Sequence, residues 1–181
     1  MEVISLELEG LKLIRPKVFG DSRGFFLETY SRSLYLDAGL DITFVQDNHS
    51  RSVKGTLRGL HYQSSPGQAK LLRVSAGRIW DVAVDIRPKS PTFGRWYGAE
   101  LDAEKHEQLY IPVGFAHGFC VLSDVADVQY KCSSPYDGST ECGLHWADPE
   151  LGVRWPVSEP LLSARDQQGE AFASFRARVG R

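Results

Sequence analysis

The chain has 181 residues, of which 42% are hydrophobic and 24% are charged. This length suits one domain with a sizeable core, so we expect a single domain over residues 1–181. The formal net charge of -2 argues against a nucleic-acid-binding protein, which usually carries a basic excess. No apolar run approaches the roughly 20 residues that cross a bilayer, and residues 1–7 lack the basic and apolar regions of a signal peptide.

The predicted elements are short and mostly strands. In chain order, strands are predicted over residues 3–8, 11–14, 71–75, 79–86 and 125–132, and short helices over residues 31–38 and 163–168. Ser31 or Ser33 would cap the first helix, and Gly39 would end it. The alternating strand at the N-terminus is of a kind that often extends a sheet edge, including that of a second subunit. Short strands with frequent Gly and Pro turns predict an all-β sandwich or barrel.

Three cysteines, Cys120, Cys132 and Cys142, occur without a CxxC pair. The number is odd, and disulfide frameworks belong mainly to small secreted chains. Cys132 and Cys142 could bracket a loop, but we expect reduced thiols in a cytoplasmic protein. Cys120 and Cys132 lie in alternating apolar stretches and are expected in the core.

The most informative stretch is residues 58–63, which read Arg-Gly-Leu-His-Tyr-Gln. With Gly55, and with Pro-Val-Gly-Phe-Ala-His at residues 112–117, it comes close to the two-part signature of a cupin metal site. Gln63 and Gln68 stand where that signature has a histidine and a carboxylate. Because neutral amides are weak ligands for transition metals and Lys70 would repel a dication, we expect no metal. A histidine that can act as a base and a lysine cation, without a set of metal ligands, indicate acid–base chemistry that uses no metal.

A lone histidine in a strand is most often structural, but several ionisable and polar residues accompany His61. Arg58 and Lys70 supply cations, His117 returns from a turn, and Gln63 shares the strand face of His61. Ionisable groups gathered inside a barrel are costly to bury without a use. We therefore treat His61 as a candidate catalytic residue.

Other candidates have plausible structural explanations as well. Arg23 and Arg58 lie beside glycines and aromatic residues and could bind phosphate oxygens. A single arginine on the surface is, however, usually a solvated charge. No GxGxxG or P-loop motif occurs, so a dinucleotide cofactor is not supported. Tyr130 could act as a general acid or be a core tyrosine. Asp166 could orient an imidazole or begin a helix.

Several motifs in a fixed order resemble the dTDP-4-dehydrorhamnose 3,5-epimerase family, which serves dTDP-L-rhamnose synthesis. The resemblance spans about residues 10–166. The motifs lie at residues 21–28, 46–50, 57–63, 70–71, 81–87, 111–119, 130 with 136, 146–149 and 163–166.

The resemblance implies a cupin-type double-stranded β-helix, or jelly roll, with a few short helices and no cofactor or metal. It implies a cytoplasmic homodimer whose substrate is a dTDP-4-keto-6-deoxy sugar nucleotide. His61 would be the base, Tyr130 the acid, Asp166 the partner of the base, and Lys70 the support of the enolate. Substrate contacts would come from Lys70 and from Arg23, Glu28, Gln46, Asn48, Arg58, His117, Tyr136, Glu141 and Arg165.

Three alternatives remain open from sequence. A related enzyme that inverts only the 3- or the 5-carbon would share every motif. A sugar-nucleotide-binding cupin without activity would not need both His61 and Tyr130. A metal-dependent cupin oxygenase would need the ligands that Gln63 and Gln68 replace.

Overall fold

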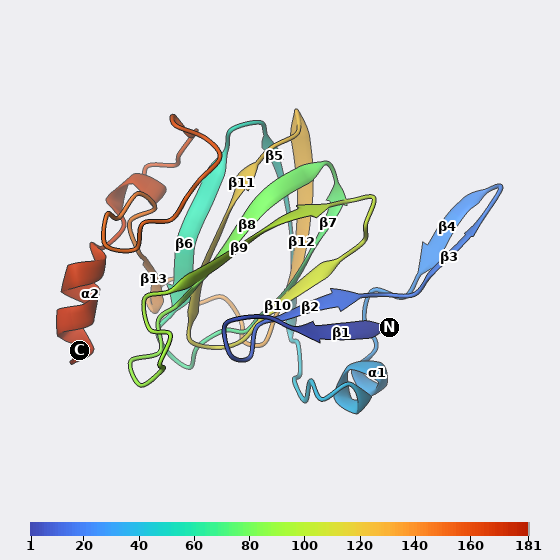
Figure 1. Ribbon diagram of the computed structural model, residues 1–181, viewed down its shortest axis with the longest axis horizontal. Coiled ribbons are helices and arrows are strands. Elements are labelled where there is room, and N and C mark those ends of the chain that lie inside the picture. The colour runs from blue at the N-terminus through green and yellow to red at the C-terminus, as the bar shows by residue number, and fades with distance from the viewer. Residues whose placement is uncertain (181) are drawn as a thin grey trace.

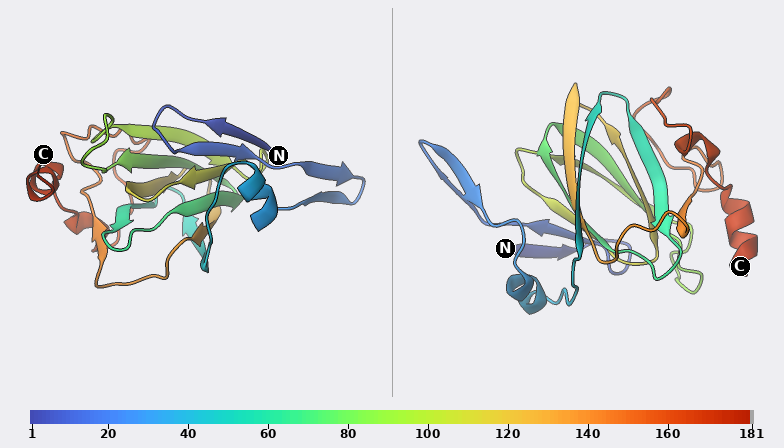
Figure 2. Two further views of the ribbon diagram at one scale, coloured as in Figure 1. Left: turned by 90° about the horizontal axis from the view of Figure 1, so that it is seen from below. Right: turned by 180° about the vertical axis from the view of Figure 1, so that it is seen from behind.

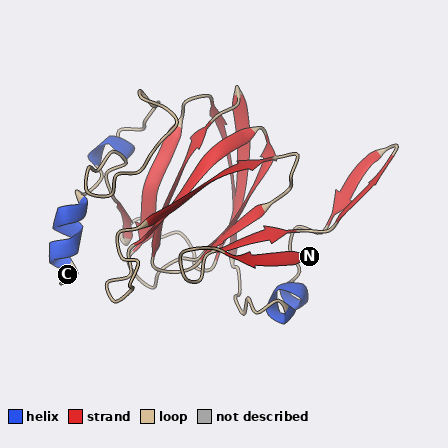
Figure 3. Ribbon diagram, viewed as in Figure 1, coloured by secondary structure: helices blue, strands red, loops and turns tan. Residues whose placement is uncertain are grey.

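The computed structural model describes residues 1–180 and is dominated by antiparallel strands (Figures 1 and 3). The all-β prediction is confirmed. The strands are β1 (Glu2–Ser5), β2 (Lys12–Arg15), β3 (Val18–Asp21), β4 (Gly24–Leu27), β5 (Gln46–Val53), β6 (Leu57–Gln63), β7 (Lys70–Ala76), β8 (Arg78–Asp85), β9 (Trp96–Asp102), β10 (Gln108–Ile111), β11 (Phe115–Val121), β12 (Val125–Cys132) and β13 (Glu141–Gly143).

Two sheets form the body of the molecule. One has the order β1-β2-β10-β7-β12-β5 and the other has the order β13-β6-β11-β8-β9. A separate two-stranded hairpin, β3-β4, projects away from both sheets (Figures 1 and 2). The N-terminal strand β1 extends the edge of its own sheet by pairing with β2.

The helices are few and short, as predicted. Helix α1 (Arg32–Asp37) follows Ser31, and Gly39 comes shortly after it with a φ of +79°, which suits a helix end. The predicted turn at 163–168 is a 3-10 helix, η1, over Asp166–Gln168. Helix α2 (Phe172–Arg178) was not predicted. No helix among residues 1–180 is long and apolar enough to cross a membrane.

The main core fills the space between the sheets on one side of the barrel. Each fully buried leucine, isoleucine or valine there stabilises the fold by about 1.5–3 kcal/mol. The cluster comprises Leu8, Leu11, Leu72, Val74, Ile79, Ala83, Leu101, Leu109, Ile111, Phe115, Phe119, Val121, Ala126 and Val128. The other side of the interior is left to polar side chains.

Strand β8 is buried on both faces. Asp81 and Asp85 are fully buried, while Val82 and Val84 pack in a second cluster with Phe172 of α2. The strand therefore has an interior face that combines Asp81 and Asp85 with Ile79 and Ala83 of the main core, and a face covered by helix α2. The alternation of polar and apolar residues in this strand does not mark a face open to water.

Candidate active site

A cavity of about 460 Å³ opens between the two sheets at the polar side of the barrel. Strands of both sheets line it, together with the loop before β13 and the segment that leads into η1. Its lining residues are Gln46, Asn48, Ser50, Arg58, His61, Gln68, Lys70, His117, Phe119, Tyr130, Tyr136, Glu141, Ser163, Arg165 and Asp166.

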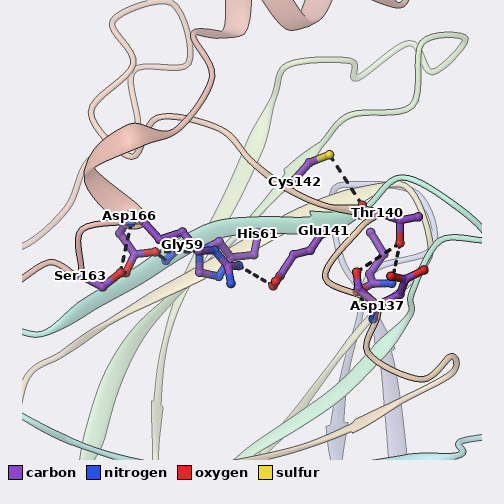
Figure 4. Close-up of polar contacts among 10 residues, drawn as sticks. Gly59, His61, Asp137, Thr140, Glu141, Cys142, Ser163 and Asp166 are labelled. Carbon is purple, nitrogen blue, oxygen red and sulfur yellow. Dashed lines mark hydrogen bonds and ion pairs between the residues drawn. The ribbon is translucent and has the colours of Figure 1, made fainter.

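His61 and Asp166 form the central pair (Figure 4). The Nε2 atom of His61 lies 2.7 Å from Oδ1 of Asp166, in a geometry too bent for a well-aligned hydrogen bond. Asp166 Oδ2 accepts a hydrogen bond from Ser163 Oγ at 2.6 Å, and Oδ1 accepts one from the backbone N–H of Gly59 at 3.3 Å. These contacts fix a carboxylate behind the imidazole.

The contacts of Asp166 also control its charge. Burial alone raises the pKa of Asp166, but the contacts from His61, Ser163 and the Gly59 amide outweigh burial and bring the pKa down to about 2. Asp166 is therefore an anion at neutral pH. A buried anion beside Nε2 favours the tautomer that carries its proton on Nε2, which leaves Nδ1 of His61 free to accept a proton.

Two glycines allow the strands around His61 to approach closely. A side chain on Gly59, whose φ is +140°, would lie 2.5 Å from the Cα of Gly118 in the neighbouring strand β11. Gly118 faces the same constraint, because its Cβ would lie 2.7 Å from the carbonyl oxygen of Arg58. This contact sets the distance between β6 and β11, and so between the two histidines that these strands carry.

The buried His117 and the half-buried Lys70 form a second group. Nε2 of His117 lies 2.8 Å from Oδ2 of the fully buried Asp81, whose Oδ1 has no hydrogen-bond partner. Burial lowers the pKa of His117, although Asp81 opposes the change. Burial also lowers the pKa of Lys70, opposed by Cys132, Asp81 and Glu141. A lysine held in this cavity can place its ammonium group against a developing negative charge.

Tyr130 approaches the cavity from the opposite sheet. Its strand β12 lies in the six-stranded sheet, whereas His61 lies on β6 in the five-stranded sheet. Burial raises the pKa of Tyr130, which keeps the phenol protonated at neutral pH. The Nζ of Lys70 lies 6.0 Å from the centre of the Tyr130 ring. A protonated phenol and an imidazole thus line one cavity from two different sheets.

Polar groups surround the entrance. Arg165 forms an ion pair with Glu141, and Glu141 in turn raises the pKa of the exposed Tyr136. On strand β5, Gln46 Nε2 donates to Asn48 Oδ1 at 3.0 Å. Arg58, the remaining predicted cation at the cavity, donates from Nε to Ser52 Oγ at 3.0 Å.

The two glutamines at the expected metal-ligand positions bind neighbouring backbone and side chains instead. Gln68 Nε2 donates to the Ser134 carbonyl at 2.9 Å, and Gln63 Nε2 donates to Thr140 Oγ1 at 3.1 Å. Within residues 1–180, no three His, Cys, Asp or Glu side chains gather in a group that could hold a metal ion.

Comparison with known proteins agrees with this geometry. The family model of dTDP-4-dehydrorhamnose 3,5-epimerase matches residues 5–174. The dTDP-4-dehydrorhamnose 3,5-epimerase of Shigella flexneri is 52% identical over 174 residues, which are 95% of this chain and 96% of that protein. The chain belongs to the dTDP-4-dehydrorhamnose 3,5-epimerase family. It is therefore an isomerase.

Solved structures of this epimerase family share the whole fold. A dTDP-6-deoxy-D-glucose-3,5-epimerase from Legionella pneumophila, crystallised with dTDP-4-keto-L-rhamnose, has a TM-score of 0.94 at 47% identity and covers 98% of this chain and 96% of its own. The cupin-type jelly roll predicted from sequence is confirmed. A dTDP-4-dehydrorhamnose 3-epimerase from Streptomyces niveus is also related, with 42% identity over 97% of this chain and 86% of that protein.

Two of the residues expected from the epimerase family lie outside the cavity. The Arg23 side chain, on the β3-β4 hairpin, is 89% exposed and pairs with Asp21 at 2.6 Å. Glu28 follows the same hairpin and is also exposed. The other expected residues, from Gln46 to Asp166, all line the cavity.

Ser50, Phe119 and Ser163 line the cavity but were not predicted as site residues. Ser50 stands two positions after Asn48 on β5, so the two-residue period of a strand could have indicated it. Ser163 gave a weaker signal, because its role depends on the fold of the segment before η1.

Proposed function

We propose that the protein inverts the 3- and 5-carbons of dTDP-4-dehydro-6-deoxy-D-glucose and so forms dTDP-4-dehydro-L-rhamnose, for dTDP-L-rhamnose synthesis. The observation that carries this proposal is the placement of His61 and Tyr130, which line one cavity from opposite sheets. Inversion requires that a proton leaves one face of the sugar ring and another arrives on the opposite face. A base and an acid on two sides of one cavity suit that requirement.

His61 is the base in this proposal. Both carbons lie next to the 4-keto group, so loss of either proton gives an enolate. Nδ1 of His61 accepts the proton, and the Asp166 anion, 2.7 Å from Nε2, stabilises the imidazolium that forms. Tyr130 then donates a proton from the opposite face. General acid–base groups of this kind contribute roughly 100- to 10,000-fold to the rate.

Lys70 stabilises the enolate oxygen. An ammonium group in a buried cavity acts on the developing charge more strongly than it would in water, and one such donor is often worth about 3 kcal/mol. His117, held by Asp81, supplies a further polar contact to the sugar.

The nucleotide binds at the entrance. Arg58 and Arg165 offer guanidinium groups to the diphosphate, because their planar forks match phosphate oxygens. Gln46, Asn48, Tyr136 and Glu141 contact the nucleoside. Arg23 and Glu28 complete the site, but they do so from a second copy of the chain.

We propose a homodimer in which the β3-β4 hairpin crosses to the partner. Phe25 and Phe26 on this hairpin are 62% and 68% exposed. Neighbouring aromatic side chains with this much exposed surface are typical of a surface that packs against another protein chain. A projecting hairpin with exposed aromatic residues suits exchange between two identical subunits. The three cysteines of the chain are free, which fits a reducing compartment, and we propose a cytoplasmic enzyme.

A second candidate is inversion of one carbon only, which is favoured by the similarity to a 3-epimerase from Streptomyces niveus. Incubation with the 4-keto sugar nucleotide in D₂O, followed by NMR, separates the candidates. The double epimerase incorporates deuterium at both carbons and gives an L-configured product. Deuterium at one carbon alone would favour the single epimerase, and no incorporation at all would indicate a binding protein.

A further inference from the structure

Residues 133–140, which connect β12 to β13, have no strand partner of their own and are fastened to the barrel through glutamines. Gln63 Oε1 accepts a hydrogen bond from the backbone N–H of Asp137 at 3.2 Å, and its Nε2 donates to Thr140 Oγ1 at 3.1 Å. Gln68 Nε2 donates to the Ser134 carbonyl at 2.9 Å. Figure 4 shows the Asp137–Thr140 turn with its contacts, close to Glu141.

These side-chain contacts hold positions that the backbone does not. Backbone bonds fix only the two ends of the loop: the Ser133 N–H donates to the Ala69 carbonyl at 3.0 Å, and the Ser64 N–H donates to the Thr140 carbonyl at 2.9 Å. Between these ends, side chains hold the loop: Gln63 and Gln68 make the contacts described above, and the Ser134 hydroxyl donates to the Gly67 carbonyl at 2.9 Å. Gln63 itself is only 8% exposed, and its truncation would remove the partner of the Asp137 N–H and of the Thr140 hydroxyl in two part-buried hydrogen bonds.

The loop carries the residues that flank the cavity entrance. The Tyr136 ring is 56% exposed and lines the cavity, and its backbone N–H donates to Gln46 Oε1 at 2.8 Å. Directly after the loop, Glu141 begins β13 and pairs with Arg165. A shift of the loop therefore moves Tyr136 relative to the floor of the cavity, whereas Glu141 is held by the pairing of β13 with β6.

We propose that Gln63 and Gln68 are positioning residues, a glutamine clasp that holds the loop and its Tyr136 against the bound nucleotide and thereby sets nucleotide affinity. The inference rests on the proposed function, in which the nucleotide occupies this entrance. The clasp acts on binding and leaves His61 and Tyr130 in place. It gives a defined role to the amides that stand where a cupin metal site has ligands.

The first test measures dTDP binding by calorimetry together with steady-state kinetics. In the Gln63→Ala/Gln68→Ala double variant, the Kd for dTDP and the KM rise about tenfold, while kcat stays within about twofold. Ser64→Ala is the matched control, because its hydroxyl donates at 3.0 Å to the same loop while its backbone N–H keeps its own bond. This control leaves Kd unchanged. Equal Kd values for the double variant and the wild type would overturn the clasp.

The second test separates positioning from simple stabilisation. Tyr136→Ala weakens dTDP binding in the wild-type background but has little further effect in the double variant, because the ring is already misplaced there. Additive effects would contradict the proposal. If Gln63→Ala does not fold, the same comparison is made between Tyr136→Ala, Gln68→Ala and the variant that combines them. If the wild type itself does not bind dTDP, both the proposed function and the clasp are contradicted. If all variants bind dTDP as the wild type does, only the clasp is contradicted.

Discussion

His61 and His117 stand directly opposite one another on the antiparallel strands β6 and β11, yet each is paired with a different buried aspartate. The His61 side chain is 24% exposed and contacts Asp166, whereas His117 is 7% exposed and contacts Asp81. Two histidines that look equivalent in sequence therefore occupy different environments. Both rings line the cavity beside an aspartate, but the His61 ring is the more exposed of the two, which supports its proposed role as the base.

Replacement of His61 tests that role. His61→Ala is expected to lower kcat by roughly 100- to 10,000-fold, because it removes the only proposed proton acceptor. Nucleotide affinity stays nearly unchanged, since the entrance residues are untouched. The measurement is a steady-state assay together with dTDP calorimetry. A variant that retains more than half of the wild-type kcat would contradict the assignment.

Asp166 links the active site to stability. Its pKa in the folded protein is about 2, below the ordinary value of 3.8, so ionised Asp166 stabilises the fold by about 2 kcal/mol. Because the folded pKa is the lower one, this contribution is fully present above about pH 4 and is lost as the pH falls toward about 2. Asp166→Asn is thus expected to be less stable than the wild type at neutral pH.

Urea unfolding at two pH values checks the linkage. The stability difference between wild type and Asp166→Asn is largest at pH 7 and shrinks at about pH 3. A difference that is constant with pH would show that lost packing, and not the charge of Asp166, causes the destabilisation. Asp21→Asn on the exposed hairpin is a suitable control, because exposed pairs contribute little.

Lys70 should limit activity at high pH. Burial lowers its pKa below the ordinary 10.5, so its ammonium charge is lost at a lower pH than that of a surface lysine. Burial raises the pKa of Tyr130, so the phenol loses its proton at a higher pH than an exposed tyrosine does. We expect kcat to fall on the alkaline side as Lys70 deprotonates. Lys70→Met would lose about 100-fold in kcat and also lose this pH dependence. If kcat of Lys70→Met still falls at high pH, a group other than Lys70 causes that fall.

Complementation tests the exchange of hairpins. Arg23→Ala and His61→Ala variants are each expected to be nearly inactive alone. When they are mixed and allowed to exchange subunits, half of the dimers contain one site with both residues intact, so activity recovers to about a quarter of wild type. No recovery after demonstrated subunit exchange would mean that Arg23 serves the site of its own chain or none.

Much of the fold was accessible from sequence. Strands over 79–86 and 125–132 appear as β8 and β12 within one residue, because both alternate strongly and end at turn residues. Helix α2 was missed, since its stability depends on Phe172 and Phe175 packing against the outer face of β8. A helix of this length forms through such tertiary contacts, which sequence does not display.

The site was accessible in part. His61 and His117 could be placed together because their motifs fall on strands. The resemblance to the epimerase family also implied Asp166 as the partner of His61, and the two side chains lie 2.7 Å apart, whereas the pairing of Asp81 with His117 required coordinates. Asp81 reads from sequence as one polar position of an alternating strand. Arg23 shows the opposite case: its motif is clear, yet within one chain it lies on the projecting hairpin, away from the cavity.

The most direct measurement follows deuterium in the Tyr130→Phe variant by NMR. With the 4-keto sugar nucleotide in D₂O, His61 should still remove a proton and return deuterium to the same face, so label enters the sugar while its configuration is retained and net inversion falls by at least about 100-fold. Inversion at the wild-type rate in this variant would contradict a base and an acid acting from opposite sides of the cavity.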